Sequence, residues 1–108
     1  MLSLALLLAT CASAQPEVAA VIDKPTKETR AELAQAVSSA LNGAPVTLAD
    51  DALTRDSLLI VEKRLTGRDF DRPEHFRLVK TDKHCTLVHE RTGKRTTLAS
   101  TTCLPVVP

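Results

Sequence analysis

Apolar residues recur at helical spacing between residues 26 and 41. Positions three or four apart lie on one face of a helix, and this spacing is shared by Leu33, Ala36, Val37, Ala40 and Leu41. Thr29-Arg30-Ala31-Glu32 has the capping-box pattern, and Thr26 is an alternative N-cap one turn earlier. Asn42-Gly43 is a typical stop signal. The pattern predicts one amphipathic helix over residues 26–41.

The chain after residue 44 has short apolar runs bounded by polar turn residues, which is typical of strands. The predicted strands are 45–48, 57–64, 75–80, 85–90 and 95–98. The second contains four consecutive apolar residues, a pattern typical of a strand that is buried on both faces or nearly so. In the third, Phe76 and Leu78 share one face. Residues 91–94 predict a hairpin loop with Gly93 in the left-handed region.

Strands that follow a helix along the chain predict an α+β domain. We expect a single small domain over residues 26–108, with one N-terminal amphipathic helix packed on a three- to four-stranded antiparallel meander. Residues 15–25 contain two prolines and are predicted to form a flexible leader, although residues 18–22 could instead form an added edge strand. The tail over residues 101–108 also contains two prolines, so we expect no central strand there.

Residues 1–14 have the composition of an export signal. The apolar run ends at Ala12-Ser13-Ala14, an A-x-A cleavage pattern, so we predict cleavage before Gln15 and a periplasmic or secreted protein. The alternative is a lipoprotein. Leu8-Ala9-Thr10-Cys11 resembles a bacterial lipobox, which would attach a lipid to Cys11 and tether the chain to a membrane.

Three cysteines are present, and Cys11 lies in the predicted signal. The remaining two, Cys85 and Cys103, are an even number in an exported chain, which favours a disulfide. The bond would tie the C-terminal tail to the body of the domain and stabilise it by about 3 kcal/mol in the chain-entropy model. The competing interpretation makes Cys85 a nucleophile or metal ligand, and an oxidising compartment disfavours it.

The composition narrows the classes of function. The 108 residues include 2% aromatic ones and have a net charge of +1, so both the stacking platform and the basic excess of nucleic-acid-binding proteins are missing. No apolar run approaches the ~20 residues of a transmembrane span. Residues 15–62 contain four basic and eight acidic residues, whereas residues 63–95 contain ten basic and five acidic ones. This asymmetry predicts either a basic face for an anionic envelope component or ordinary solvated faces.

No motif predicts a catalytic centre or a cofactor. Gly93-Lys94-Arg95-Thr96 lacks the spacing of a phosphate-binding loop, and Ser57 lacks the glycines of a nucleophile elbow. A zinc site would need three or four ligands. The candidate ligands are His75, His84 and His89, joined by Asp71 or Glu74. Their spacing matches no compact ligand motif, so we predict no metal site.

Three runs of the chain carry a resemblance to known proteins: LNGAPVTLADDALT over residues 41–54, EHFRLV over residues 74–79 and LVHERTG over residues 87–93. With them the chain resembles a group of small exported proteins of proteobacteria. The resemblance implies a signal peptide and an envelope location. It brings no assigned activity and no catalytic residues.

We expect a non-catalytic envelope protein that acts as a small binding module for an unidentified envelope protein or component. Its expected contact region is the polar loop 65–74, because loops on rigid scaffolds carry function. Arg68, Phe70 and Arg72 in this loop belong to residue types enriched in interfaces. An exposed edge strand could also accept a partner strand. The alternative function is inhibition of a secreted or host hydrolase, a lysozyme or a protease. A metal carrier or an enzyme is the remaining class.

Overall fold

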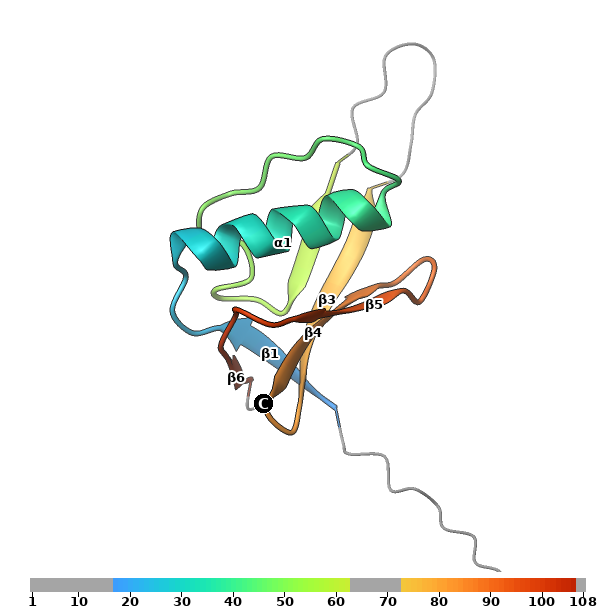
Figure 1. The fold of residues 1–108 in the computed structure, drawn as a ribbon. Coiled ribbons are helices and arrows are strands. Elements are labelled where there is room, and N and C mark those ends of the chain that lie inside the picture. The colour runs from blue at the N-terminus through green and yellow to red at the C-terminus, as the bar shows by residue number, and fades with distance from the viewer. Residues whose placement is uncertain (1–16, 63–72, 107–108) are drawn as a thin grey trace, which may run out of the picture.

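The computed structural model describes residues 17–62 and 73–106 (Figure 1). The elements in chain order are β1 (Val18–Ile22), α1 (Lys27–Ala40), β2 (Leu58–Val61), β3 (Glu74–Thr81), β4 (His84–His89), β5 (Arg95–Leu98) and β6 (Cys103–Pro105). One helix lies across one face of a six-stranded antiparallel sheet. The α+β class is therefore confirmed, but the sheet is larger than the three- to four-stranded meander that the sequence predicts.

Helix α1 begins at the earlier of the two candidate caps. The Oγ1 atom of Thr26 accepts a hydrogen bond from the N–H of Thr29 at 3.1 Å, and Thr29 itself lies buried inside the first turn. The capping box at Thr29 is wrong, because the Glu32 carboxylate accepts the N–H of Ser100 instead. At the other end, Asn42 and Gly43 have left-handed φ values of +59° and +83°, so the helix ends at the predicted Asn42-Gly43 stop.

Strands β2 to β5 form a meander of consecutive antiparallel strands. Strand β1 lies on the same side of β3 as β2 does, but it pairs with the opposite end of β3, at Val79 and Lys80. Strand β6 pairs with the other side of β1. The predicted leader is therefore wrong for residues 18–22. The alternative, a strand over these residues, is confirmed, although the strand lies between β3 and β6 rather than at an edge.

Two further strand predictions are wrong. Residues 45–48 form no strand and belong to the loop that runs from the end of α1 to β2 (Figure 1). Pro45 has no N–H to donate to a ladder. Segment 57–64 contains β2, but this strand is not buried on both faces, since Ile60 is 53% exposed. The predicted hairpin loop between β4 and β5 is confirmed, with Gly93 at a φ of +76°.

The face of the sheet beneath α1 holds the core. Directly paired residues of neighbouring strands share a face, and Phe76 and Leu78 are both fully buried on the core face, as predicted. The apolar stripe of α1 packs onto them. The buried apolar residues are Ala20, Ile22, Leu33, Ala36, Val37, Leu41, Leu53, Val61, Phe76, Leu78, Cys85, Leu87, Leu98 and Cys103.

A disulfide joins Cys85 of β4 to Cys103 of β6, as predicted. Strands β3 and β1 lie between these two strands in the sheet order, and three strand spacings would be about 14 Å in a flat sheet. The Cα atoms of the two cysteines are 6.1 Å apart, so the sheet curls until β6 lies against β4. The bond indicates an oxidising compartment. Among the described residues, no helix is long and apolar enough to cross a membrane.

Removal of the disulfide tests its contribution to stability. The bond closes a loop with a sequence separation of 18, and the chain-entropy model gives about 3 kcal/mol for such a loop. We expect the Cys85→Ser, Cys103→Ser double variant to lose about 3 kcal/mol of unfolding free energy in urea titrations. Reduction of the wild type should have the same effect. A loss below about 1 kcal/mol would contradict this role of the bond.

Candidate functional site

Three strands of the sheet have an outer edge with no pairing strand among the described residues: β5, β6 and β2. Proteins usually protect such edges with charge or proline, because an unpaired edge recruits other chains. Strand β5 carries Arg95 and two threonines, and β6 carries Pro105, which has no N–H to donate. Strand β2 has the sequence LLIV and carries neither protection. It is the unprotected edge of the sheet.

The hydrogen-bond pattern shows which backbone groups of β2 point outward. The N–H of Leu78 donates to the carbonyl of Ser57 at 2.9 Å, so Ser57 directs its backbone toward β3. In an antiparallel ladder such residues alternate with outward-facing ones. Leu59 therefore faces β3, whereas the N–H and C=O groups of Leu58 and Ile60 point away from it. We call these outward groups the free edge of β2.

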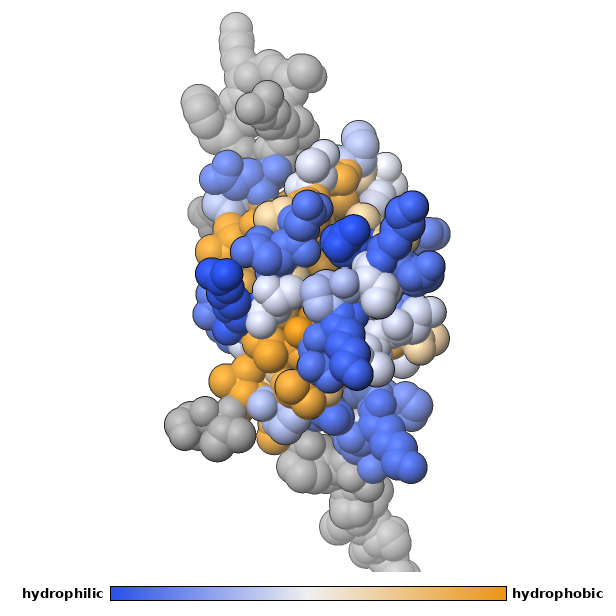
Figure 2. Space-filling view, turned by 90° about the vertical axis from the view of Figure 1, so that its left-hand side faces the viewer, coloured by the Kyte–Doolittle hydropathy of each residue, from blue (hydrophilic) through white to orange (hydrophobic). Residues whose placement is uncertain are grey.

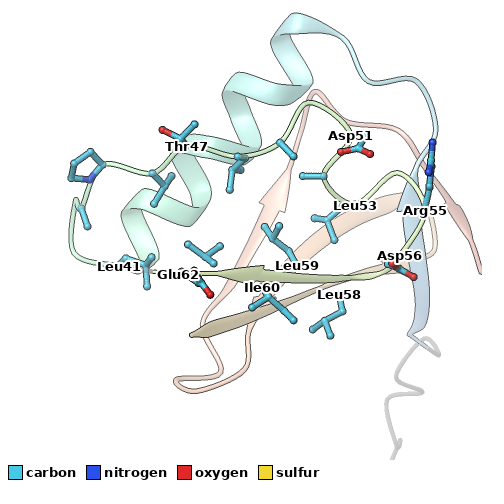
Figure 3. A pocket seen from close by; sticks show the side chains of 17 residues that line it. Leu41, Thr47, Asp51, Leu53, Arg55, Asp56, Leu58, Leu59, Ile60 and Glu62 are labelled. Atoms are coloured by element: carbon cyan, nitrogen blue, oxygen red, sulfur yellow. The ribbon is translucent and has the colours of Figure 1, made fainter. Parts of the chain in front are cut away.

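A hollow of about 1200 Å³ lies beside this free edge (Figure 3). Its walls are β2 and the loop that precedes it, and its apolar lining residues are Leu41, Ala44, Pro45, Val46, Leu48, Ala49, Ala52, Leu53, Leu58, Leu59, Ile60 and Val61. Leu59 points toward the loop, while Leu58 and Ile60 lie on the opposite side of the strand. Because both faces of β2 take part, the hollow follows the edge of the strand. Its volume exceeds the ~300–1,000 Å³ of typical small-molecule sites.

Charged side chains lie at the two ends of this hollow. Figure 3 shows Arg55 and Asp56 near the start of β2, Asp51 on the loop wall toward the same end of the hollow, and Glu62 at the end of β2. All four are exposed. Three acidic residues against one basic residue give the rim an acidic excess.

The end of β2 lies beside a buried ionic cluster. Val61 pairs with Glu74 at the start of β3, and Glu74 is only 5% exposed. Its Oε1 is 2.5 Å from Nε2 of His89, and its Oε2 is 2.9 Å from Nη2 of Arg91. His89 is buried as well and stacks on Phe76, with ring centroids 4.6 Å apart. The hydrogen bonds from His89 and Arg91 compensate the carboxylate for the water that it loses on burial.

The cluster has the connectivity of a hydrolytic triad. Because the Nε2 side of His89 bonds to Glu74, its Nδ1 can accept the hydroxyl proton of Thr92, whose Oγ1 is 2.9 Å away. A triad also needs N–H donors for the developing oxyanion. The two N–H groups that follow Thr92 are already used: that of Gly93 donates to the His89 carbonyl, and that of Lys94 donates to Thr92 Oγ1. We therefore assign the cluster a structural role.

The cluster also sets the ionisation of its carboxyl group. Burial acts to raise the pKa of Glu74, but the hydrogen bonds and positive charges of Arg91 and His89 outweigh it. The net effect lowers the pKa of Glu74 below its ordinary value of 4.5. A carboxyl group with a lowered folded-state pKa stabilises the fold above its unfolded-state pKa. This contribution is lost as the pH falls through the folded-state pKa.

The residues predicted to form an interaction loop, Arg68, Phe70 and Arg72, lie outside the described residues. Cys11, the predicted lipidation site, and the signal over residues 1–14 lie outside them as well. The structure therefore leaves these predictions as they stand. Of the predicted site residues, Cys85 and Cys103 are the pair that it brings together.

The histidines considered as metal ligands do not gather. His75 and His89 lie on neighbouring strands, but His89 is buried on the core face against Phe76. His75 is exposed, and its Nδ1 lies 3.6 Å from Oε1 of Glu90. His84 lies at the opposite end of β4 from His89. Within residues 17–62 and 73–106, no three metal-binding side chains come together.

The hollow and the Glu74–His89 pair are not predicted from the sequence. Extension of predicted strand 75–80 by one residue would have placed Glu74 on the buried face with Phe76 and Leu78. No local signal predicts the hollow, because its loop wall meets β2 only when the chain has folded. Comparison of the chain with family models, curated proteins and solved structures found no match.

Substitution of the buried carboxylate tests the structural role of the cluster. We expect Glu74→Gln to lose at least about 1.5 kcal/mol of unfolding free energy at neutral pH, because hydrogen bonds to charged groups contribute roughly 1.5–3 kcal/mol. The matched control is Glu90→Gln, which removes a surface carboxylate paired with Arg77. It should cost less than about 1 kcal/mol.

The same variant tests the lowered pKa of Glu74. Urea titrations in a series of acidic buffers should show the stability difference between the wild type and Glu74→Gln narrowing as the pH falls below 4.5. The difference narrows because the variant has no carboxylate charge at any pH, and protonation of Glu74 removes this charge from the wild type as well. A difference that stays constant with pH would contradict the ionised pair.

Proposed function

We propose that this chain is an exported binding module that holds an extended apolar segment of a partner polypeptide as an added strand along β2. The observation that carries the proposal is the unprotected edge of β2 beside an apolar hollow (Figure 3). The backbone N–H and C=O groups of Leu58 and Ile60 form hydrogen bonds with the added strand, and the hollow receives its side chains. The proposal includes no catalytic step, no metal and no cofactor.

A second apolar surface lies at β1 and β6, and it is a weaker candidate. Hydrophobic residues gather in the lower part of the view in Figure 2, and Val18, Leu104 and Val106 are between 41% and 48% exposed. None of these three lines the hollow, and Pro105 interrupts the edge of β6. This surface provides a control for the site at β2.

The disulfide supports the exported location, since such bonds persist in oxidising compartments. The signal peptide over residues 1–14 and the alternative lipid anchor on Cys11 remain predictions. In either case the partner is another exported or envelope polypeptide. The alternative function, inhibition of a secreted or host hydrolase, requires a rigid exposed loop. Residues 65–72 of the loop predicted for contacts lie outside the described residues, and Glu74 begins β3.

Binding of a defined peptide tests the proposal. The probe is a fluorescein-labelled peptide with four consecutive Val and Ile residues between serines, and the anisotropy of its label is followed as protein is added. We expect saturable binding, because the probe can complete the ladder at the free edge of β2. Amide resonances of Leu58 and Ile60 should shift on binding, because their N–H groups gain acceptors.

A pair of variants locates the binding site. Ile60→Asp places a charge at the hollow, and we expect at least about tenfold weaker binding because an unpaired charge is costly to desolvate. The matched control is Leu104→Asp, at a residue 48% exposed against 53% for Ile60, and it should leave binding unchanged. Equal weakening by both substitutions, or amide shifts centred on β5 or β6, would contradict the assignment to β2.

A further inference from the structure

The start of β2 is the more acidic end of the hollow. Asp51, Arg55 and Asp56 lie there (Figure 3), and the exposed Asp50 precedes them, which gives three acidic residues and one basic residue. Within the part of the chain that the structure describes, neither Asp51 nor Asp56 makes an ion pair. These carboxylates are available to a partner.

The opposite end of the hollow has a smaller excess. Among the lining residues that the structure describes, Glu62 is the one exposed carboxylate at that end. The charge of the site is therefore asymmetric along β2. A strand that binds there meets negative charge where β2 begins.

The architecture of the sheet sets the direction of an added strand. Every strand pair in it is antiparallel, and antiparallel pairs are also the commoner kind in proteins. An antiparallel partner runs opposite to β2, so its C-terminal residues lie beside the start of β2. The partner residue opposite Asp56 follows the one opposite Leu58 by two positions.

We infer that the partner segment consists of about four apolar residues followed within two or three positions by Lys or Arg. This inference rests on the proposed function and names the chemistry of its partner. The basic residue lies beside Asp56 at the start of β2 and fixes both direction and register, because charged pairs at an interface add specificity. An acidic residue at the same position is repelled.

Three peptides with the same apolar core test the inference. One carries two lysines after the core, one carries two lysines before it, and one carries two glutamates after it. The first should bind about two- to fivefold more tightly than the second, as expected for solvent-exposed ion pairs, and the third should bind most weakly. The preference for the peptide with lysines after the core should decrease at high salt, because salt screens exposed charges.

A pair of isosteric variants locates the charge. Asp56→Asn should reduce the preference for lysines after the core. The control is Asp82→Asn, which makes the same charge change in the exposed turn between β3 and β4. The left-handed φ of +56° at Asp82 suits asparagine, so the control should keep the preference.

The possible outcomes separate the inference from the function on which it rests. Equal binding of all three peptides, or tighter binding of the one with lysines before the core, overturns the inference and leaves the proposed function standing. An effect of Asp82→Asn as large as that of Asp56→Asn overturns it too. If none of the peptides binds, the proposed function fails and the inference fails with it.

Discussion

The bond between Cys85 and Cys103 closes a sheet that its hydrogen bonds alone would leave open at β6. That strand has three residues and pairs only with β1 among the described strands, so the bond to β4 is its second attachment. Because the disulfide holds β6 in place, β1 has a fixed neighbouring strand on each side, β3 and β6. The curl that results makes one face of the sheet concave, and α1 lies across it (Figure 1).

Coverage of the concave face explains where the hollow lies. Helix α1 has 14 residues, which is about 21 Å of helix, and it packs over the middle of the sheet. The loop after the helix covers the remaining side, next to β2. This loop and β2 enclose the hollow between them (Figure 3). Strand β2 is held in place by the bond from Leu78 to Ser57 at one end and by pairing with Glu74 at the other. A fixed edge loses little conformational entropy when it binds a partner strand.

The features that the sequence predicts correctly are those determined by neighbouring residues. The helix, its stop at Asn42-Gly43 and the hairpin at Gly93 all depend on local backbone preferences. The disulfide is the exception, since it follows from the number of cysteines. Strand β1 is different. Its partners, β3 and β6, lie far along the chain, so no local pattern distinguishes it from a leader.

The candidate site could be predicted only in part, for a related reason. Four consecutive apolar residues fit a strand buried on both faces, and they fit equally well a strand whose edge borders an apolar hollow. Only the absence of a second pairing strand among the described residues separates these cases. Glu74 was missed because the predicted strand began one residue too late. The sequence predicts an edge strand as a possible binding element, but it does not indicate that β2 is the candidate.

Amide hydrogen exchange in the free protein tests the central claim most directly. The account requires the N–H groups of Leu58 and Ile60 to face outward without a partner, while that of Leu59 bonds to β3. We expect Leu58 and Ile60 to exchange at nearly unprotected rates and Leu59 to exchange orders of magnitude more slowly. Protection of Ile60 equal to that of Leu59 would show that another segment already covers the edge, and it would contradict the account.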